Sequence, residues 1–268
     1  MPRKKGTAAI FLCAGDNSSV SKKPLIVAID GPSGAGKGTV ARAVAARLRY
    51  RHIDTGAMYR AVAWKARQDR IDLADEAAIA AIGERATFDL AQGRVVIDGD
   101  DVSAAIRTPE IDAAATTVAR HPAVRRALVA HQRVYGADGG IVMEGRDIGT
   151  VVFPDADVKI YLDASPEERA RRRAADPAHT SSKGTQLSEV AIALADRDKS
   201  DSTRAASPLA VASDAIVIDT TGIPIESVIE SVLTIVNAKC ERAPAAASEG
   251  RREPPQSGGP SAQRGGES

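Results

Sequence analysis

Short apolar runs that end in an acidic residue recur along the middle of the chain. The four runs cover residues 25–29, 140–143, 158–162 and 215–218, and they are followed by Asp30, Glu144, Asp163 and Asp219. Continuous apolar stretches of this length are typical of strands that are buried on both faces of a sheet. The pattern therefore predicts four buried strands.

Helical periodicity alternates with these strands. Residues 39–49 place four aliphatic side chains on one helical face, and residues 224–236 again follow a strand as a predicted helix. Ser165 followed by Pro166 and two glutamates is typical of a helix start, and another helix is expected from about Leu187. This alternation predicts an α/β fold, with a parallel sheet flanked by helices.

Residues 71–118 interrupt the alternation. Within them, residues 94–102 resemble a β-hairpin whose turn is Asp98 and Gly99. We expect residues 71–118 to form a small α+β insert within one domain that spans residues 24–237.

Composition narrows the class of protein. The chain has 268 residues, of which 43% are hydrophobic and 26% charged, values that are close to globular averages. A net charge of +1 argues against a general binder of polyanions, and 3% aromatic residues offer few surfaces for base stacking. Two cysteines cannot form a disulfide framework, and no apolar run approaches the length of a membrane span. We expect a cytoplasmic monomer with no nucleic-acid or membrane partner.

The two ends of the chain differ in composition from its middle. Residues 1–23 combine a basic start with an apolar patch that is too short for a signal peptide. Residues 238–268 are rich in Ala, Pro, Gly, Ser, Glu and Arg, without apolar periodicity. We expect both to be disordered. A nucleic-acid role for the basic N-terminus is an alternative.

A glycine-rich segment joins the first predicted strand to the first predicted helix. It consists of Gly31, Pro32, Ser33, Gly34, Ala35, Gly36, Lys37, Gly38 and Thr39. Glycines let backbone N–H groups approach phosphate oxygens, the following helix points its positive end at them, and the lysine adds a charge. The alternative is an ordinary strand-to-helix turn, but the strand and helix context favours a phosphate-binding loop.

The loop variant points to a kinase. In GTPases a Ser or Thr directly follows the lysine, whereas here Gly38 intervenes before Thr39. This arrangement resembles the loop of nucleoside monophosphate kinases. The Asn-Lys-x-Asp motif that reads guanine in GTPases is also absent from the sequence, which disfavours a nucleotide-dependent switch.

A kinase of this kind needs arginines outside the loop to hold a second phosphorylated substrate. Residues 54–60, 144–147, 169–173 and 197–204 each supply arginine beside acidic, hydroxyl or aromatic side chains. Each segment also has a plain structural interpretation, as a helix cap or a solvated helix face. Beside a phosphate-binding loop, these segments favour an acceptor site and a mobile lid of residues 172–186.

Together these segments resemble the bacterial cytidylate kinase family. The matching stretches are IDGPSGAGKGT from Ile29, DTGAMYR from Asp54, GRDIGTVVFPDA from Gly145, KIYLDAS from Lys159 and RDKSDSTR from Arg197. The resemblance implies a P-loop kinase that transfers the ATP γ-phosphoryl group to CMP or dCMP with Mg²⁺. The implied metal contacts are Thr39 and, through water, Glu144.

The resemblance also assigns site residues. ATP would bind the loop from Gly31 to Thr39. The implied acceptor site consists of Thr55, Tyr59, Arg60, Thr116, Arg125, Arg146, Asp147, Arg197, Asp201 and Arg204. The implied catalytic residues are Lys37, Arg146, Arg172 and Arg204, with the lid residues Arg169 and Arg173 near the transferred group.

Within this assignment the acceptor residues have separate tasks. Asp147, Arg125 and Thr116 would read cytosine, and Arg197 and Asp201 would contact the sugar. Three positions depart from the common family pattern: Thr55 and Thr116 replace serine, and Glu144 replaces aspartate. A different small-molecule acceptor on the same loop is the remaining enzymatic alternative.

Overall fold

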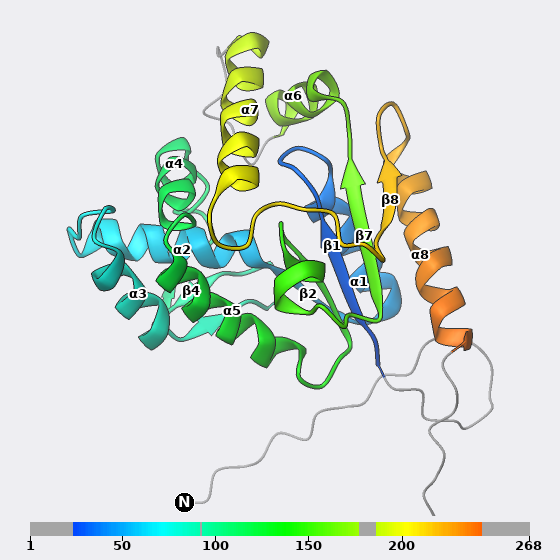
Figure 1. The fold of residues 1–268 in the computed structure, drawn as a ribbon, viewed down its shortest axis with the longest axis horizontal. Coiled ribbons are helices and arrows are strands. Elements are labelled where there is room, and N and C mark those ends of the chain that lie inside the picture. The colour runs from blue at the N-terminus through cyan, green and yellow to red at the C-terminus, as the bar shows by residue number, and fades with distance from the viewer. Residues whose placement is uncertain (1–23, 92, 177–185, 243–268) are drawn as a thin grey trace, which may run out of the picture.

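A five-stranded parallel sheet forms the centre of the molecule (Figure 1). The computed structural model describes residues 24–91, 93–176 and 186–242. The strands, in the spatial order β2-β6-β1-β7-β8, are β2 (Arg51–Asp54), β6 (Ile141–Glu144), β1 (Ile26–Asp30), β7 (Val158–Asp163) and β8 (Ile216–Asp219). The four strands predicted from apolar runs are confirmed, and the parallel α/β fold with them. Burial of the fourth was predicted wrongly, because β8 lies at the sheet edge and its residues Ile216 and Val217 are exposed. β2 was not predicted, because it lies at the edge of the sheet and mixes exposed and buried residues.

The register brings the acidic strand ends to one edge of the sheet. Glu144 pairs in register with both Ile29 and Asp54, and Asp163 pairs with Asp219. The phosphate-loop segment leaves β1 at the same edge. Ligands of open parallel sheets bind beyond the carboxyl ends of the strands, so this edge is the expected site.

Helices cover both faces of the sheet, which is why its central strands are continuous apolar runs. Alternate residues of β1 serve the two faces. Val27 and Ile29 pack in a core with α1 (Lys37–Leu48) and α8 (Ile225–Arg242). Ala28 packs on the other side, with Val129 of α5 (Pro122–Gly136) and Ile148. Ile148 begins a short π-helix, η1 (Ile148–Val152), immediately after Asp147.

Two further helices stand above the carboxyl ends of the strands (Figure 1). α6 (Pro166–Ala175) begins at the predicted N-cap Ser165, whose hydroxyl accepts a hydrogen bond from the Glu168 N–H. α7 (Leu187–Thr203) starts where the sequence predicted. Of the predicted lid, residues 177–185 lie outside the described residues, as do residues 1–23 and 243–268 of the predicted tails.

Residues 71–118 contain both helices and strands. They comprise α3 (Glu76–Arg85), β3 (Phe88–Asp89), β4 (Val96–Ile97), β5 (Asp100–Asp101) and α4 (Pro109–Val118). β4 and β5 form the predicted hairpin, and its turn residues Asp98 and Gly99 have φ angles of 51° and 92°. Two consecutive positive φ angles are typical of the hairpin turn that matches strand twist. α3 and α4 pack against α2 (Thr55–Gln68) through a separate apolar cluster.

The C-terminal helix is longer than the sequence predicted. α8 continues to Arg242, past the expected domain end at residue 237. Cys240 is only 6% exposed and packs in the core with α1, so apolar burial extends the helix by another turn. Among the helices that the structure describes, none is long and apolar enough to cross a membrane.

Candidate active site

The glycine-rich segment wraps tightly between β1 and α1. Gly31 has a φ of +146°, and a Cβ there would lie 2.0 Å from the carbonyl oxygen of Leu162, so no other residue fits. Gly36, the N-cap of α1, is left-handed with a φ of 89°. α1 then begins at Lys37 and directs its positive end into the loop. This geometry is suited to binding phosphate.

Lys37 lies at the centre of the loop and is 6% exposed. Its Nζ donates a hydrogen bond to the carbonyl oxygen of Pro32 at 2.6 Å. Burial, helped by the charge of Arg146 and opposed by Glu144, lowers the pKa of Lys37 to about 7. An anion bound in the loop would restore the charge of the lysine.

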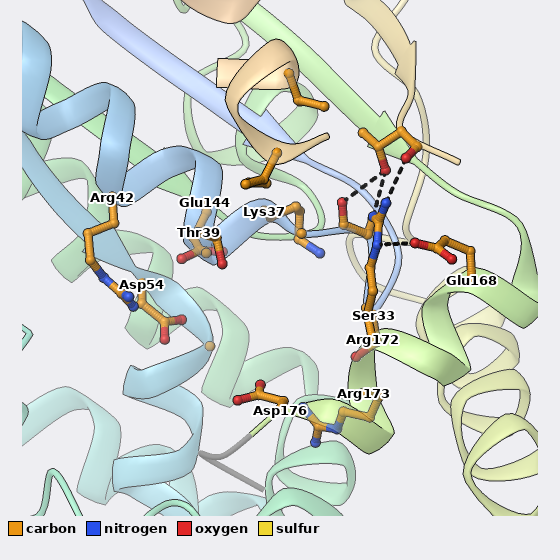
Figure 2. Close-up of a pocket in the computed structure, with 18 of the residues that line it drawn as sticks. Ser33, Lys37, Thr39, Arg42, Asp54, Glu144, Glu168, Arg172, Arg173 and Asp176 are labelled. Carbon is orange, nitrogen blue, oxygen red and sulfur yellow. Dashed lines mark hydrogen bonds and ion pairs between the residues drawn. The ribbon is translucent and has the colours of Figure 1, made fainter. Parts of the chain in front are cut away.

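A cavity of about 730 Å³ opens in front of the loop. It is lined by the loop from Ser33 to Thr39, by Arg60 of α2, and by Arg146, Arg172 and Arg197. Figure 2 shows Lys37, Arg172 and Arg173 among the side chains that line this cavity. Burial and the neighbouring Arg146 lower the pKa of Arg197 to about 10. The cavity therefore concentrates positive charge that its own carboxylates do not fully neutralise, which favours anionic ligands.

Two buried carboxylates organise the arginines beside this cavity. Asp201 accepts hydrogen bonds from Arg146 Nε at 2.9 Å and from Arg204 Nη1 at 3.3 Å. Asp147 pairs with Arg125, which is 3% exposed, and lies 3.8 Å from Arg204 Nη2. Burial alone would raise the pKa of Asp201, but its arginine neighbours outweigh burial and lower it. The structure thus brings together five of the acceptor residues expected from the sequence.

The remaining predicted acceptor residues lie around this cluster. Tyr59 is 8% exposed, and its ring centroid lies 5.3 Å from Arg125 Cζ. Burial raises the pKa of Tyr59 to about 12, so its hydroxyl stays protonated. Arg60 donates to Asp54 at 2.8 Å and lines the cavity. Tyr59 thus packs beside the buried Arg125, while Arg60 belongs to the wall of the cavity.

The two predicted threonines use their hydroxyls locally. Thr55 Oγ1 donates to the carbonyl oxygen of Glu144 at 2.8 Å, and Thr116 Oγ1 donates to that of Asp112 at 2.9 Å. Neither residue lines the cavity. Thr55 therefore joins the start of α2 to the end of β6, a supporting role that the sequence did not suggest.

The predicted metal contacts face the cavity. Thr39 and Glu144 both line it beside Lys37. The Glu144 carboxylate lies against Gly38, where a Cβ would be 3.2 Å from Oε1, and it is 2.9 Å from Nε2 of His52. Among the residues that the structure describes, no group of three or more His, Cys, Asp and Glu is arranged to hold a metal. One hydroxyl and one carboxylate fit a Mg²⁺ ion whose other ligands are nucleotide oxygens and water.

Three of the four arginines of α6 have different surroundings. Arg172 lines the cavity and donates to Glu168 Oε1 at 2.8 Å and to the carbonyl oxygen of Thr220 at 2.6 Å (Figure 2). Arg173 also lines the cavity and pairs with Asp112. Arg169 lies instead behind the loop, where its guanidinium donates to Ser33 O at 3.2 Å and pairs with Asp198. The structure thus corrects the expected position of Arg169, because the buried side chain supports the loop from outside the cavity.

Sequence reasoning missed Asp112. This residue lies on α4, and its pairing with Arg173 links the predicted insert to α6 across the cavity. Burial would lower the pKa of Arg60, but Asp54 and then Asp112 outweigh it and raise the pKa. Helical spacing could have pointed to it, because Asp112 lies one helical turn before Thr116, a residue that the sequence did predict.

A model of the cytidylate kinase family matches residues 27–238 of the chain. A cytidylate kinase of Desulfitobacterium hafniense is 48% identical over 223 residues, covering 82% of this chain and 96% of the relative. A cytidylate kinase of Solibacter usitatus is 46% identical over 224 residues, covering 83% and 96%. A bifunctional pantoate ligase/cytidylate kinase of Prochlorococcus marinus is 46% identical over 225 residues, covering 82% of this chain and 46% of the longer relative.

Proposed function

This chain belongs to the cytidylate kinase family, and we propose that its cavity transfers the γ-phosphoryl group of ATP to CMP or dCMP, giving ADP and CDP or dCDP. The enzyme is a nucleoside monophosphate kinase of pyrimidine nucleotide metabolism. The observation that carries the assignment is a single cavity lined by both a phosphate-binding loop and separate arginines, Arg60, Arg146 and Arg197. Such a cavity can hold two phosphorylated ligands at once.

The donor phosphates bind the loop from Gly31 to Thr39. The backbone N–H groups and the start of α1 supply fixed partial charges, and Lys37 supplies a full charge at the β- and γ-phosphates. Mg²⁺ carried by ATP neutralises phosphate charge when bound, and Thr39, with Glu144 through water, would hold it.

The acceptor phosphate binds on the opposite side of the cavity. Arg60 and Arg146 line the cavity, and Arg204 is joined to Arg146 through the Asp201 carboxylate. Arg197 and Asp201 contact the sugar. An acceptor phosphate is already ionised, so no general base is needed, and alignment with charge neutralisation lowers the barrier. Arg172 and Arg173 approach the transferred phosphoryl group from α6.

Base recognition depends on the buried pair of Asp147 and Arg125. Cytosine presents an amino group where uracil presents a carbonyl, so a carboxylate acceptor at this position favours cytosine. Arg125 holds the Asp147 carboxylate in place, and Tyr59 provides an apolar wall. Thr116 supports this region from α4 through its hydrogen bond to the Asp112 carbonyl oxygen. The cavity is built within one chain, and we expect the enzyme to act as a monomer.

An acceptor screen tests the proposed function. Purified protein with ATP and Mg²⁺ is assayed for ADP release with CMP, dCMP, UMP, AMP and shikimate as acceptors. We expect CMP and dCMP to be preferred. Turnover of shikimate or AMP in preference to both cytidine nucleotides would overturn the assignment.

A variant of Asp147 tests the base-reading role. Asp147→Asn keeps the size of the side chain but replaces one acceptor oxygen with a donor. We expect kcat/KM for CMP to fall about 10- to 100-fold relative to UMP, the range for one mispaired base edge. ATP affinity, measured separately by titration, serves as the control. Equal losses of CMP turnover and ATP binding would indicate misfolding and contradict this role.

A further inference from the structure

A buried carboxylate connects the two ligand-binding segments of the site. Asp30 is the last residue of β1, directly before the phosphate-binding loop, and it is 5% exposed. Its Oδ1 accepts the backbone N–H of Ile148 at 2.9 Å, and its Oδ2 accepts that of Gly149 at 2.7 Å. The function proposed above gives Asp30 no task.

The two N–H groups belong to the turn that carries two proposed acceptor residues, one for the phosphate and one for the base. Arg146 and Asp147 immediately precede Ile148, the first residue of η1. Asp147 is thus fixed on one side by Arg125 and on the other by the bonds from Asp30 to the next two peptides. Because Asp30 also begins the loop, the same carboxylate sets the distance between the donor phosphates and the acceptor base.

The turn has little freedom to settle elsewhere. A Cβ on Gly149 would lie 3.1 Å from Lys159 Cδ and 3.4 Å from Asp30 Oδ2, so the peptide packs closely between these two side chains. Burial, opposed by the two backbone N–H groups and aided less by Asp147, raises the pKa of Asp30 to about 6. Burial is unfavourable for a carboxylate. The two hydrogen bonds that Asp30 accepts therefore explain its presence here better than packing does.

We propose that Asp30 is a positioning residue for acceptor selectivity, which holds Asp147 at the cytosine edge at a set distance from the phosphate-binding loop. This proposal rests on the proposed function. It predicts that weakening the two bonds to Asp30 loosens the choice between CMP and UMP more than it changes ATP binding. A purely structural carboxylate would lower stability without changing acceptor choice.

The main test is Asp30→Asn. The amide keeps the shape of the side chain, but it can accept only one of the two N–H groups and opposes the other. We expect KM for CMP to rise about tenfold and the CMP/UMP ratio of kcat/KM to fall about tenfold, the effect of one lost hydrogen bond. KM for ATP should stay within about threefold of the parent value, because the substitution affects the neighbouring phosphate-binding loop only indirectly.

Asp157→Asn provides a matched control. Asp157 Oδ2 accepts the backbone N–H of Ile26 at 2.8 Å, which is the same kind of bond at the opposite end of β1. Thermal unfolding of both variants measures the structural cost of the exchange. We expect Asp157→Asn to lower the melting temperature without changing the CMP/UMP ratio.

Gly149→Ala tests the same contact from the other side, should Asp30→Asn fold poorly. The added methyl group pushes the Gly149 peptide away from Oδ2, and we expect the same loss of selectivity. An unchanged CMP/UMP ratio in folded Asp30→Asn or Gly149→Ala would overturn the proposal. If the parent protein does not phosphorylate CMP at all, the proposed function itself fails, which the acceptor screen reveals beforehand.

Discussion

Arg146 donates a hydrogen bond from Nε to Oδ2 of Asp201 at 2.9 Å, joining two residues that are 55 positions apart in the chain. The same carboxylate accepts Arg204 Nη1 at 3.3 Å through its other oxygen. One anion therefore orients two cations of the proposed acceptor site. Their spacing depends on where α7, which carries Asp201, lies relative to the end of β6, which precedes Arg146.

Removing this anion should disorganise both arginines. We expect Asp201→Ala to lower kcat/KM for CMP by about 100-fold, because a buried charge pair that loses one partner costs several kcal/mol. A double-mutant cycle with Arg146→Ala should show that the two losses are not additive. Asp196→Ala, at an exposed position of the same helix, is the control. Strictly additive losses would contradict the shared role.

ATP binding should take up a proton at Lys37. With its pKa lowered to about 7 by burial, Lys37 is roughly nine-tenths neutral at pH 8. Bound phosphates favour the charged form and raise the pKa, so ATP affinity should fall as pH rises above 7. Calorimetric titrations at pH 8, in buffers with different ionisation enthalpies, measure the uptake.

Lys37→Met supplies the comparison for this experiment. Because Lys37 is roughly nine-tenths neutral at pH 8, the variant should take up about 0.9 fewer protons per ATP bound. Its kcat should fall by about 100- to 1,000-fold, as it does when other donors to a transition state are removed. Equal uptake in parent and variant would show that another group titrates. Normal turnover by Lys37→Met would disprove a catalytic role for the lysine.

The pair of Arg173 and Asp112 should stabilise the ligand-free protein. Their side chains are 22% and 13% exposed, so solvent screens the pair only in part. We expect a double-mutant cycle of Arg173→Gln and Asp112→Asn, measured by urea unfolding, to give a coupling free energy of about 1–2 kcal/mol. The more exposed pair of Lys65 and Asp69, one helical turn apart, should give a smaller coupling free energy. Equal coupling in both pairs would contradict a link across the cavity.

The C-terminal boundary can be tested by truncation. A chain of residues 24–242 should keep the stability and activity of the full chain, because it contains all of α8. A chain of residues 24–237 loses the last turn with Cys240, which is 6% exposed, and should lose about 1–3 kcal/mol of unfolding free energy. Circular dichroism and the CMP assay compare the two. An inactive 24–242 chain would mean that residues outside this range contribute to the site.

Much of the fold could be predicted because its signals are local. An apolar run such as residues 25–29 predicts a strand, and glycines before Lys37 predict a phosphate loop. Whether the strand is buried depends on its place in the sheet, since the apolar run of edge strand β8 is exposed. The edge strand β2 has no apolar run, because Ile53 is its only buried residue. The extent of α8 likewise depends on the packing of Cys240 against α1.

The candidate site also has features that local sequence predicts and features that depend on packing. The sequence by itself determined the phosphate-binding loop, the acidic strand ends, and which arginines accompany them. Only the tertiary structure decided that Arg169 supports the loop from behind, that Asp112 reaches Arg173, and that Asp30 bonds to peptides 118 and 119 positions away. The physical reason is range: secondary-structure propensity acts over a few neighbouring residues, whereas a hydrogen bond or ion pair requires two groups within a few ångströms, which only chain packing brings about.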